Sequence, residues 1–160
     1  MNFSSIIKVL TIKLSVAFTL LILSSTNFAC DCTGPSGKSA IRENSVAFRG
    51  TVTNIEYLDA KDGKREPRIK VTFVVSRVWY GDVKKTFVLH TTENRWSCAG
   101  YYFLKDKEYL VVGYRNEGEA AKKFEGAKIT FGTNPCGATL PIDLAKEAIV
   151  ELGRGKKPKS

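Results

Sequence analysis

The sequence predicts a mainly β domain, a small barrel that is closed or nearly closed, followed by one C-terminal helix. Three observations support this fold class. Five segments are rich in β-branched and aromatic residues, with apolar side chains at every second position. The links between them carry turn residues rather than helical patterns. Helical spacing of apolar residues is found near the end of the chain, over residues 144–152.

The strands follow one another at short intervals. The longest has Ile69, Val71, Phe73 and Val75 on one face, and Gly81-Asp82 ends it. Asp62-Gly63 in the link before it is a hairpin signal. In chain order, the predicted strands are Val46 to Tyr57, Arg68 to Tyr80, Thr86 to His90, Tyr109 to Tyr114 and Lys128 to Phe131.

The predicted helix covers Leu144 to Leu152. Asp143 is placed to cap its first turn, and Gly153 to end it in a left-handed conformation. Its apolar face consists of Leu144, Ala148, Ile149 and Leu152. Residues 154–160 contain four basic side chains and no apolar one larger than proline, so we expect a disordered basic tail.

The first 29 residues have the pattern of a secretory signal peptide. Lys8 and Lys13 precede an uncharged, mostly apolar run from Leu14 to Leu23, and Ala29 fits the position before a cleavage site. That run is too short to span a bilayer, which takes roughly 20 residues. No later stretch is long and apolar enough for a membrane helix. We therefore expect a secreted or periplasmic protein whose mature chain begins at Cys30.

The mature part contains four cysteines: Cys30, Cys32, Cys98 and Cys136. An even number in an exported chain indicates two disulfides. A Cys30–Cys32 bond would close a strained, very small loop, which leaves two possible connectivities. The spacing fits no zinc-binding pattern, and export favours oxidation over metal binding.

No motif for catalysis appears in the sequence. The single histidine, His90, ends a predicted strand, where a structural role is the usual one, and the carboxylates are scattered through turns. The net charge of +9 and the many aromatic residues are compatible with nucleic-acid binding. Aromatic residues at strand spacing normally fill a barrel, however, and export argues against that role. We expect a monomer that is not an enzyme and that has no cofactor, no nucleic-acid partner and no membrane span.

The opening Cys30-Asp31-Cys32-Thr33-Gly34-Pro35 resembles that of the tissue inhibitors of metalloproteinases. Further segments are similar to the N-terminal inhibitory domain of that family, over roughly residues 30–145. They are Ala40-Ile41 with Val46 to Gly50, Val71 to Gly81, Ser97-Cys98-Ala99-Gly100, Lys107 to Gly113, and the late Cys136.

This resemblance implies an OB-fold, a five-stranded Greek-key barrel over residues 30–153, with disulfides Cys30–Cys98 and Cys32–Cys136. It also implies inhibition of a zinc metalloendopeptidase. The amine nitrogen and carbonyl oxygen of Cys30 would then bind the zinc of the target protease, the only metal involved. The implied flanking contacts with the protease are Asp31, Thr33, Gly34, Trp96 and Ser97.

The sequence also departs from the family pattern. Arg42 stands where the family's third disulfide begins, Asp31 where Thr or Ser is usual, and the family's separate C-terminal subdomain has no counterpart. The alternative is a secreted or periplasmic OB-fold binding module without inhibitory activity. A lipid anchor at Cys30 is a further alternative, although Asn27 and Phe28 fit a lipidation signal poorly.

Overall fold

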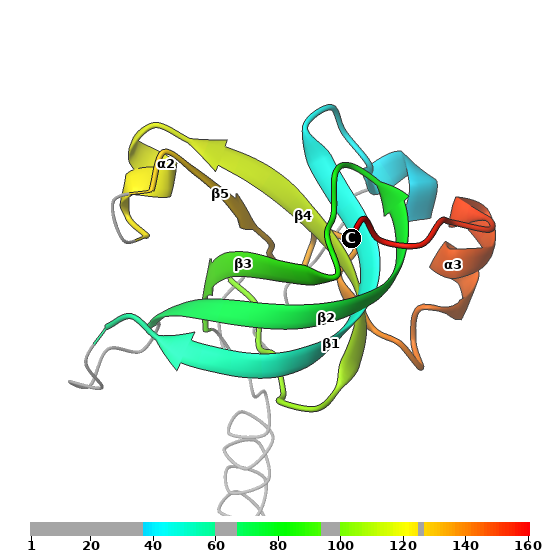
Figure 1. Ribbon diagram of the computed structural model, residues 1–160, viewed down its shortest axis with the longest axis horizontal. Coiled ribbons are helices and arrows are strands. Elements are labelled where there is room, and N and C mark those ends of the chain that lie inside the picture. Colours follow the sequence, from blue (N-terminus) through cyan, green and yellow to red (C-terminus); the bar gives the residue numbers. More distant parts are fainter. Residues whose placement is uncertain (1–36, 60–66, 94–99, 125–126) are drawn as a thin grey trace, which may run out of the picture.

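The computed structural model describes residues 37–59, 67–93, 100–124 and 127–160. Figure 1 shows one curled sheet with a helix on its outer face. The helical elements are the 3-10 turn η1 (Gly37–Ala40), α2 (Glu119–Lys122) and α3 (Lys146–Leu152). The strands are β1 (Ser45–Tyr57), β2 (Arg68–Tyr80), β3 (Thr86–Thr92), β4 (Glu108–Glu117), β5 (Ile129–Gly132) and β6 (Leu140–Pro141). No helix in these ranges is long and apolar enough to cross a membrane.

The sheet has six antiparallel strands in the order β3-β2-β1-β4-β5, and β6 pairs with β4. Because β4 returns to lie beside β1, the first four strands have the Greek-key order. The β1–β2 pairing shifts register at three places, including between Val52 and Asn54. Such irregularities bend a strand and increase its twist, and so curl the sheet.

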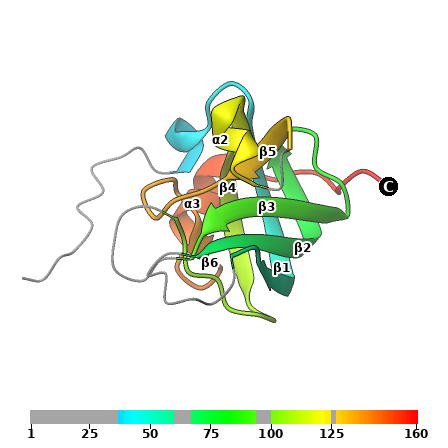
Figure 2. The same cartoon turned by 90° about the vertical axis from the view of Figure 1, so that its left-hand side faces the viewer.

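The expected barrel of five strands, closed or nearly closed, is found only in part, because the sheet is antiparallel but has six strands and does not close. Its outer strands β3 and β5 face each other (Figure 1, Figure 2) but form no strand ladder in the described ranges. They meet instead through side chains. The rings of Phe87 and Phe131 lie 5.3 Å apart, and the Thr91 hydroxyl donates to the Thr133 carbonyl at 2.9 Å.

The predicted strands are all present, with bounds that differ by a few residues except for β2, whose bounds agree. The largest difference is β4, which extends three residues beyond the predicted end at Tyr114. Its last residues are polar, and they remain extended because they pair with β5 from Tyr114↔Gly132 to Glu117↔Ile129. Neither β6 nor α2 was predicted, since two and four residues are too few to show a period.

Aromatic rings fill the concave side of the sheet. Phe48 on β1 contacts Phe73 on β2 and Phe87 on β3, with ring centroids 5.4 and 5.0 Å apart. Phe103, just before β4, lies 5.3 Å from Phe73 and 5.0 Å from Tyr109. The alternation seen in the sequence thus marks the buried face, as expected for aromatic residues at strand spacing.

A second, smaller core lies on the convex side, where α3 covers the sheet. Leu110, Ala145 and Ala148 are buried there, against Trp79, Leu140, Ile142, Ile149 and Leu152. Asp143 was predicted as the helix cap, but it lies in a turn and α3 begins three residues later, after Ala145. Leu144, predicted on the apolar face, is 68% exposed because it belongs to that turn. Gly153 ends the helix with a positive φ of 76°, as expected, although its ψ of −150° is not that of a left-handed helix.

The C-terminal tail also differs from expectation. Residues 154–160, predicted to be disordered, form backbone bridges with β2 and with the turn before β3, through Val78↔Lys156 and Lys84↔Lys159. Figure 1 shows this segment running from α3 back across the end of β2.

Candidate functional site

Most of the predicted site lies outside the described residues. This holds for Cys30, Asp31, Cys32, Thr33 and Gly34 at the expected mature N-terminus, and for Trp96, Ser97 and Cys98. Cys136 is described, and it is disulfide-bonded. The pairing stays a prediction, because the other three cysteines lie outside the described ranges. The structure does show how the segments next to these residues are held.

Residues 133–139, which we name the Cys136 loop, are fastened to β4 by two buried threonines. The hydroxyls of Thr133 and Thr139 lie 2.7 Å apart. Thr139 Oγ1 accepts from the Val112 amide at 3.0 Å, and Thr133 Oγ1 donates to the Val112 carbonyl at 2.9 Å. The two side chains therefore supply Val112 with the hydrogen bonds that a neighbouring strand would otherwise provide. Because both ends of the loop are fixed in this way, Cys136 is presented from a rigid support.

Tyr114 joins the Cys136 loop to the segment that precedes β1. Its hydroxyl donates to the Gly137 carbonyl at 3.2 Å, and the Arg42 guanidinium lies 5.9 Å from the ring centroid. Burial raises the pKa of Tyr114, and the nearby charge of Arg42 opposes that shift. Arg42 is held in turn by Ser45, whose hydroxyl donates to the Arg42 carbonyl at 2.6 Å. The chain that follows the predicted N-terminal motif thus lies beside the loop that carries Cys136.

The segment that contains Trp96, Ser97 and Cys98 is anchored at its two ends. The Tyr101 amide donates to the Thr92 carbonyl at 2.9 Å, and the Glu93 amide donates to the Pro67 carbonyl at 2.8 Å. Gly100 has a φ of +83°, and a Cβ on it would lie 2.1 Å from the Thr92 carbonyl oxygen, so this position requires glycine. The sequence indicated Gly100 only as part of a motif, although glycine is one of the strongest local signals for a turn.

Tyr101 anchors the end of this segment next to Gly100 by packing into the core. Its ring lies 4.5 Å from the ring of Phe103 and 6.1 Å from that of Tyr109. Burial raises the pKa of the Tyr101 hydroxyl well above its ordinary value, and a smaller contribution comes from Tyr109. The ring contacts make Tyr101 a packing anchor for this end of the segment.

A cavity of about 450 Å³ lies between the two anchored segments, where β3 and β5 fail to pair. Its lining is neutral, with hydroxyl, amide and aromatic groups: His90, Thr91, Thr92, Gly100, Tyr114, Asn116, Phe124, Gly132, Thr133 and Asn134. The buried Oδ1 atom of Asn134 has no hydrogen-bond partner in the described part of the protein. The His90 ring lies 5.5 Å from the ring of Phe124. These groups can bind a small neutral polar molecule by hydrogen bonds and stacking. Within the described ranges, no cluster of three or more His, Cys, Asp or Glu side chains could hold a metal ion.

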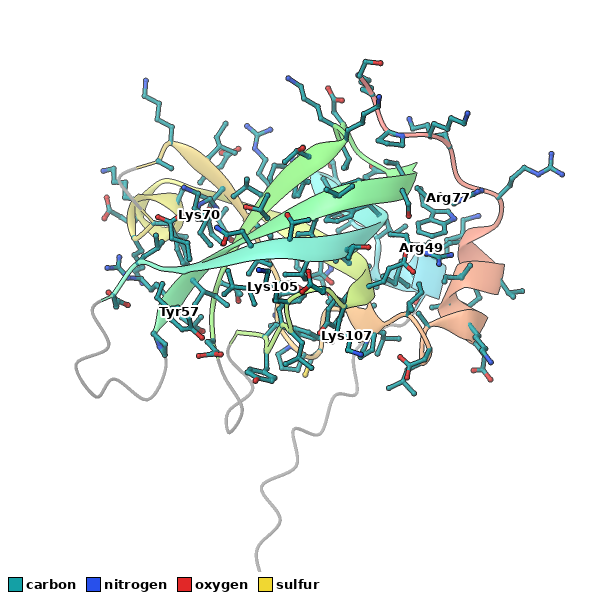
Figure 3. The ribbon with its side chains drawn as sticks, turned by 60° about the horizontal axis from the view of Figure 1, so that its bottom comes forward. Arg49, Tyr57, Lys70, Arg77, Lys105 and Lys107 are labelled. Atoms are coloured by element: carbon teal, nitrogen blue, oxygen red, sulfur yellow. The ribbon has the colours of Figure 1, made fainter. Side chains whose placement is uncertain are left out.

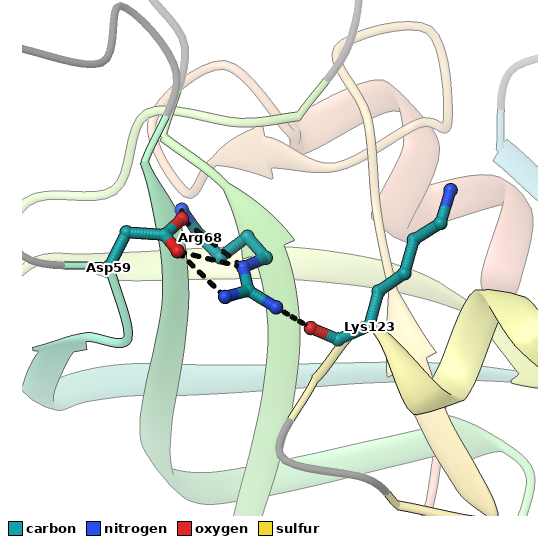
Figure 4. Close-up of polar contacts among 3 residues, drawn as sticks. All are labelled: Asp59, Arg68 and Lys123. Carbon is teal, nitrogen blue, oxygen red and sulfur yellow. Dashed lines mark hydrogen bonds and ion pairs between the residues drawn. The ribbon is translucent and has the colours of Figure 1, made fainter.

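An ion pair that the sequence did not predict, between Asp59 and Arg68, joins the end of β1 to the start of β2 (Figure 4). The buried carboxylate of Asp59 accepts from the Arg68 amide at 2.9 Å and from its guanidinium at 2.7 and 3.1 Å. The Arg68 guanidinium also donates to the Lys123 carbonyl, just after α2. The hydrogen bond with Asp59 raises the pKa of Arg68. The sequence indicated that Asp59 lies in a solvated turn. The available signal for the ion pair was the position of two opposite charges, Asp59 just after one predicted strand and Arg68 at the start of the next.

Basic residues on β1 and β2 lie at different places along the sheet. Figure 3 shows Lys70 far from Arg49 and Arg77 along β1 and β2. Two of these charges have acidic partners on the same surface. Arg49 binds Glu108 through two hydrogen bonds of 2.7 and 2.6 Å, and Lys70 lies 3.5 Å from Glu56.

A comparison with protein-family models and with curated proteins finds no match for this chain.

Proposed function

We propose that the protein is a secreted inhibitor of zinc metalloendopeptidases that acts through its mature N-terminus. A catalytic zinc keeps one coordination position open for water or substrate. The amine nitrogen and carbonyl oxygen of Cys30 would fill that position. An amine must be neutral to bind a metal, and a free α-amine has a pKa of about 7.7–8.0, so a useful neutral fraction exists near pH 7.

The observation that carries this proposal is the disulfide-bonded Cys136 on a loop fixed to β4. An inhibitor that inserts its first residues loses affinity if those residues must be ordered on binding. A disulfide from the N-terminal motif to Cys136 would transfer the rigidity of the Cys136 loop to Cys30. The anchoring of Gly100 and Tyr101 would fix the Trp96-Ser97 segment in the same way.

We further propose that the sheet is an open variant of the OB-fold. An OB-fold is a partly open Greek-key barrel of five strands. The order β3-β2-β1-β4-β5 and the close approach of Thr91 to Thr133 support an open variant of that fold. The extra strand β6 and the helix α3 would be additions on its convex side.

The test compares the natural N-terminus with a mature chain that carries one added alanine before Cys30. The extension moves the amine away from the zinc while sparing the sheet. Loss of one good metal ligand should weaken inhibition by several kcal/mol, with about 1.4 kcal/mol for each factor of ten. The matched control carries the added alanine after Ser160. Inhibition constants against a panel of zinc endopeptidases are the measurement, and equal inhibition by both forms would rule out chelation by the terminal amine.

The neutral cavity between β3 and β5 favours a second candidate function, a binding module without inhibitory activity. Its partner would be a small polar molecule that donates a hydrogen bond to Asn134 Oδ1. Absence of inhibition by the natural chain, together with ligand-induced shifts in the NMR signals of Asn134 and Tyr114, would favour this reading. The intact mass of the exported protein would show at the same time whether Cys30 is acylated.

A further inference from the structure

The C-terminal tail is docked by its backbone. The Val78 amide donates to the Lys156 carbonyl at 2.8 Å, and the Lys156 amide donates back at 2.7 Å. Further along, the Lys85 amide donates to the Lys159 carbonyl and the Lys159 amide to the Val83 carbonyl, both at 3.1 Å. These four bonds fix the path of the tail without using its charged groups.

Side chains of β2 reinforce the same path. The Trp79 indole donates to the Gly153 carbonyl at 2.8 Å, and the Arg77 guanidinium donates to the Arg154 carbonyl at 2.6 Å. Gly155 has a φ of +56°, and a Cβ there would lie 2.9 Å from Arg77 Cγ. The tail thus has a defined position against β2. Any residue larger than glycine at position 155 would disturb it.

This docking gathers positive charge along one edge of the protein. Seven exposed basic residues lie on the tail, on the end of β2 and on the turn before β3, and we name them the tail strip. They are Arg77, Lys84, Lys85, Arg154, Lys156, Lys157 and Lys159. In the described ranges, the strip forms one ion pair with an acidic residue. It joins Lys159 to Asp82 at 3.0 Å.

We propose that the tail strip binds an acidic polysaccharide, a linear chain that carries carboxylate or sulfate groups. The backbone of the strip is already ordered, so binding orders only the ends of long side chains. Closely placed cations on a fixed support attract a linear polyanion strongly, because binding releases the counterions condensed on it. This function is independent of the proposed N-terminal inhibition, because the tail strip shares no residue with the proposed zinc-binding terminus at Cys30 or its flanking contacts.

Two other polyanions fit the observations less well. A membrane surface is normally bound by cations next to a cluster of exposed apolar side chains. Here the large exposed apolar residues belong to several different elements. They are Tyr57 on β1, Val74 and Tyr80 on β2, Leu104 before β4, Ile129 on β5, Leu144 before α3 and Val150 on α3. Nucleic acid is disfavoured by the predicted export of the chain, whereas acidic polysaccharides occur outside cells.

The test uses two triple variants of equal net charge. The first carries Lys156→Gln, Lys157→Gln and Lys159→Gln, which leave the docking bonds of the backbone in place. The control carries Lys105→Gln, Lys107→Gln and Lys122→Gln, at exposed positions on other elements. Binding of the full exported chain to heparin and to polygalacturonate is measured by calorimetry at several salt concentrations, with dextran as the uncharged polysaccharide.

We expect the tail triple to lose affinity by roughly 100-fold at low salt, if each cation near an anionic surface contributes about 1 kcal/mol. Its dependence on salt should also become clearly weaker, while the control triple changes affinity less than about threefold. Equal losses in the two triples would show that net charge rather than the strip is responsible, and would overturn the proposal. Absence of binding to both acidic polysaccharides, or tighter binding to vesicles with phosphatidylglycerol, would overturn it as well.

Discussion

Replacing Thr139 by valine tests whether the Cys136 loop is held by its buried hydroxyls. Valine has nearly the same shape, so the change removes the hydroxyl and leaves the packing. Three donors and three acceptors meet at this point: the Val112 amide and carbonyl and the two threonine hydroxyls. All are satisfied if Thr139 accepts from the Val112 amide, donates to Thr133 at 2.7 Å, and Thr133 donates to the Val112 carbonyl.

The two threonines are predicted to contribute unequally. In Thr139→Val the buried Val112 amide loses its acceptor, which costs about 1–3 kcal/mol, and the bond to Thr133 contributes about 1 kcal/mol more. A buried methyl group in place of the hydroxyl offsets about 0.8 kcal/mol, so the net loss is about 2 kcal/mol. In Thr133→Val the Thr139 hydroxyl can turn to the Val112 carbonyl, which is 3.2 Å away. Every backbone group then keeps a partner, and the loss should stay below about 1 kcal/mol.

The assay is urea unfolding of the oxidised protein, which gives the free energy of unfolding for each variant. Thr53→Val is the matched control, because its hydroxyl bonds to the Thr72 carbonyl at an exposed site. Its effect should stay within about 0.5 kcal/mol. If Thr133→Val destabilises as much as Thr139→Val, or if neither exceeds the control, the threonine pair does not hold the loop.

Two further predictions concern the anchor next to the Trp96-Ser97 segment. Gly100→Ala should destabilise the protein by more than about 2 kcal/mol, because it adds a steric clash with a carbonyl oxygen to the strain of a positive φ. Gly118→Ala, with a positive φ but open space around it, should cost only about 1 kcal/mol, and equal thermal shifts would contradict this account. Because burial raises the pKa of Tyr101 in the folded state, its stabilising contribution is present below the unfolded pKa of about 10 and is lost as pH rises above it. The alkaline loss of stability should therefore be smaller in Tyr101→Phe than in the wild type or in the exposed-site control Tyr80→Phe, and identical pH profiles would disprove it.

The strands could be predicted from the sequence because their signal is local. Side chains along a strand point alternately to its two faces, so every second residue of β2 is buried. The apolar residues Ile69, Val71, Phe73 and Val75 mark that buried face directly in the sequence. The end of β4 was missed because its polar residues are held extended by β5, a partner that is distant in sequence. Closure of the sheet depends on the same kind of long-range pairing, and no local pattern reports whether β3 reaches β5.

The tail and the helix start were mispredicted for a related reason. Composition predicts disorder when a segment has too little apolar surface to bury, and residues 154–160 contain no apolar side chain larger than proline. Their order comes from backbone bonds to Val78, Val83 and Lys85, and from the Trp79 indole of another element. Asp143 has the side chain of a good cap, but the turn closed by Ile142 and Ala145 delays the helix. For the candidate site, the cysteine pattern predicted that Cys136 is disulfide-bonded, whereas the threonine pair gave no signal because threonine is also a common strand residue.

Arg42 contributes contacts that hold residues 37–44, the segment before β1, at the position where the proposed likeness to the inhibitor family would place a third disulfide. A disulfide contributes typically 2–4 kcal/mol. Here Ser45 forms two hydrogen bonds with the Arg42 backbone, at 3.1 and 2.6 Å, and such bonds contribute about 1 kcal/mol each. The Arg42 guanidinium over the Tyr114 ring adds about 0.5–1 kcal/mol. Together these contacts contribute about 2.5–3 kcal/mol, which lies within the disulfide range. Because Tyr114 also bonds to Gly137, they connect the segment before β1 to the loop of Cys136, and the proposed inhibition would require support for the N-terminus at this place.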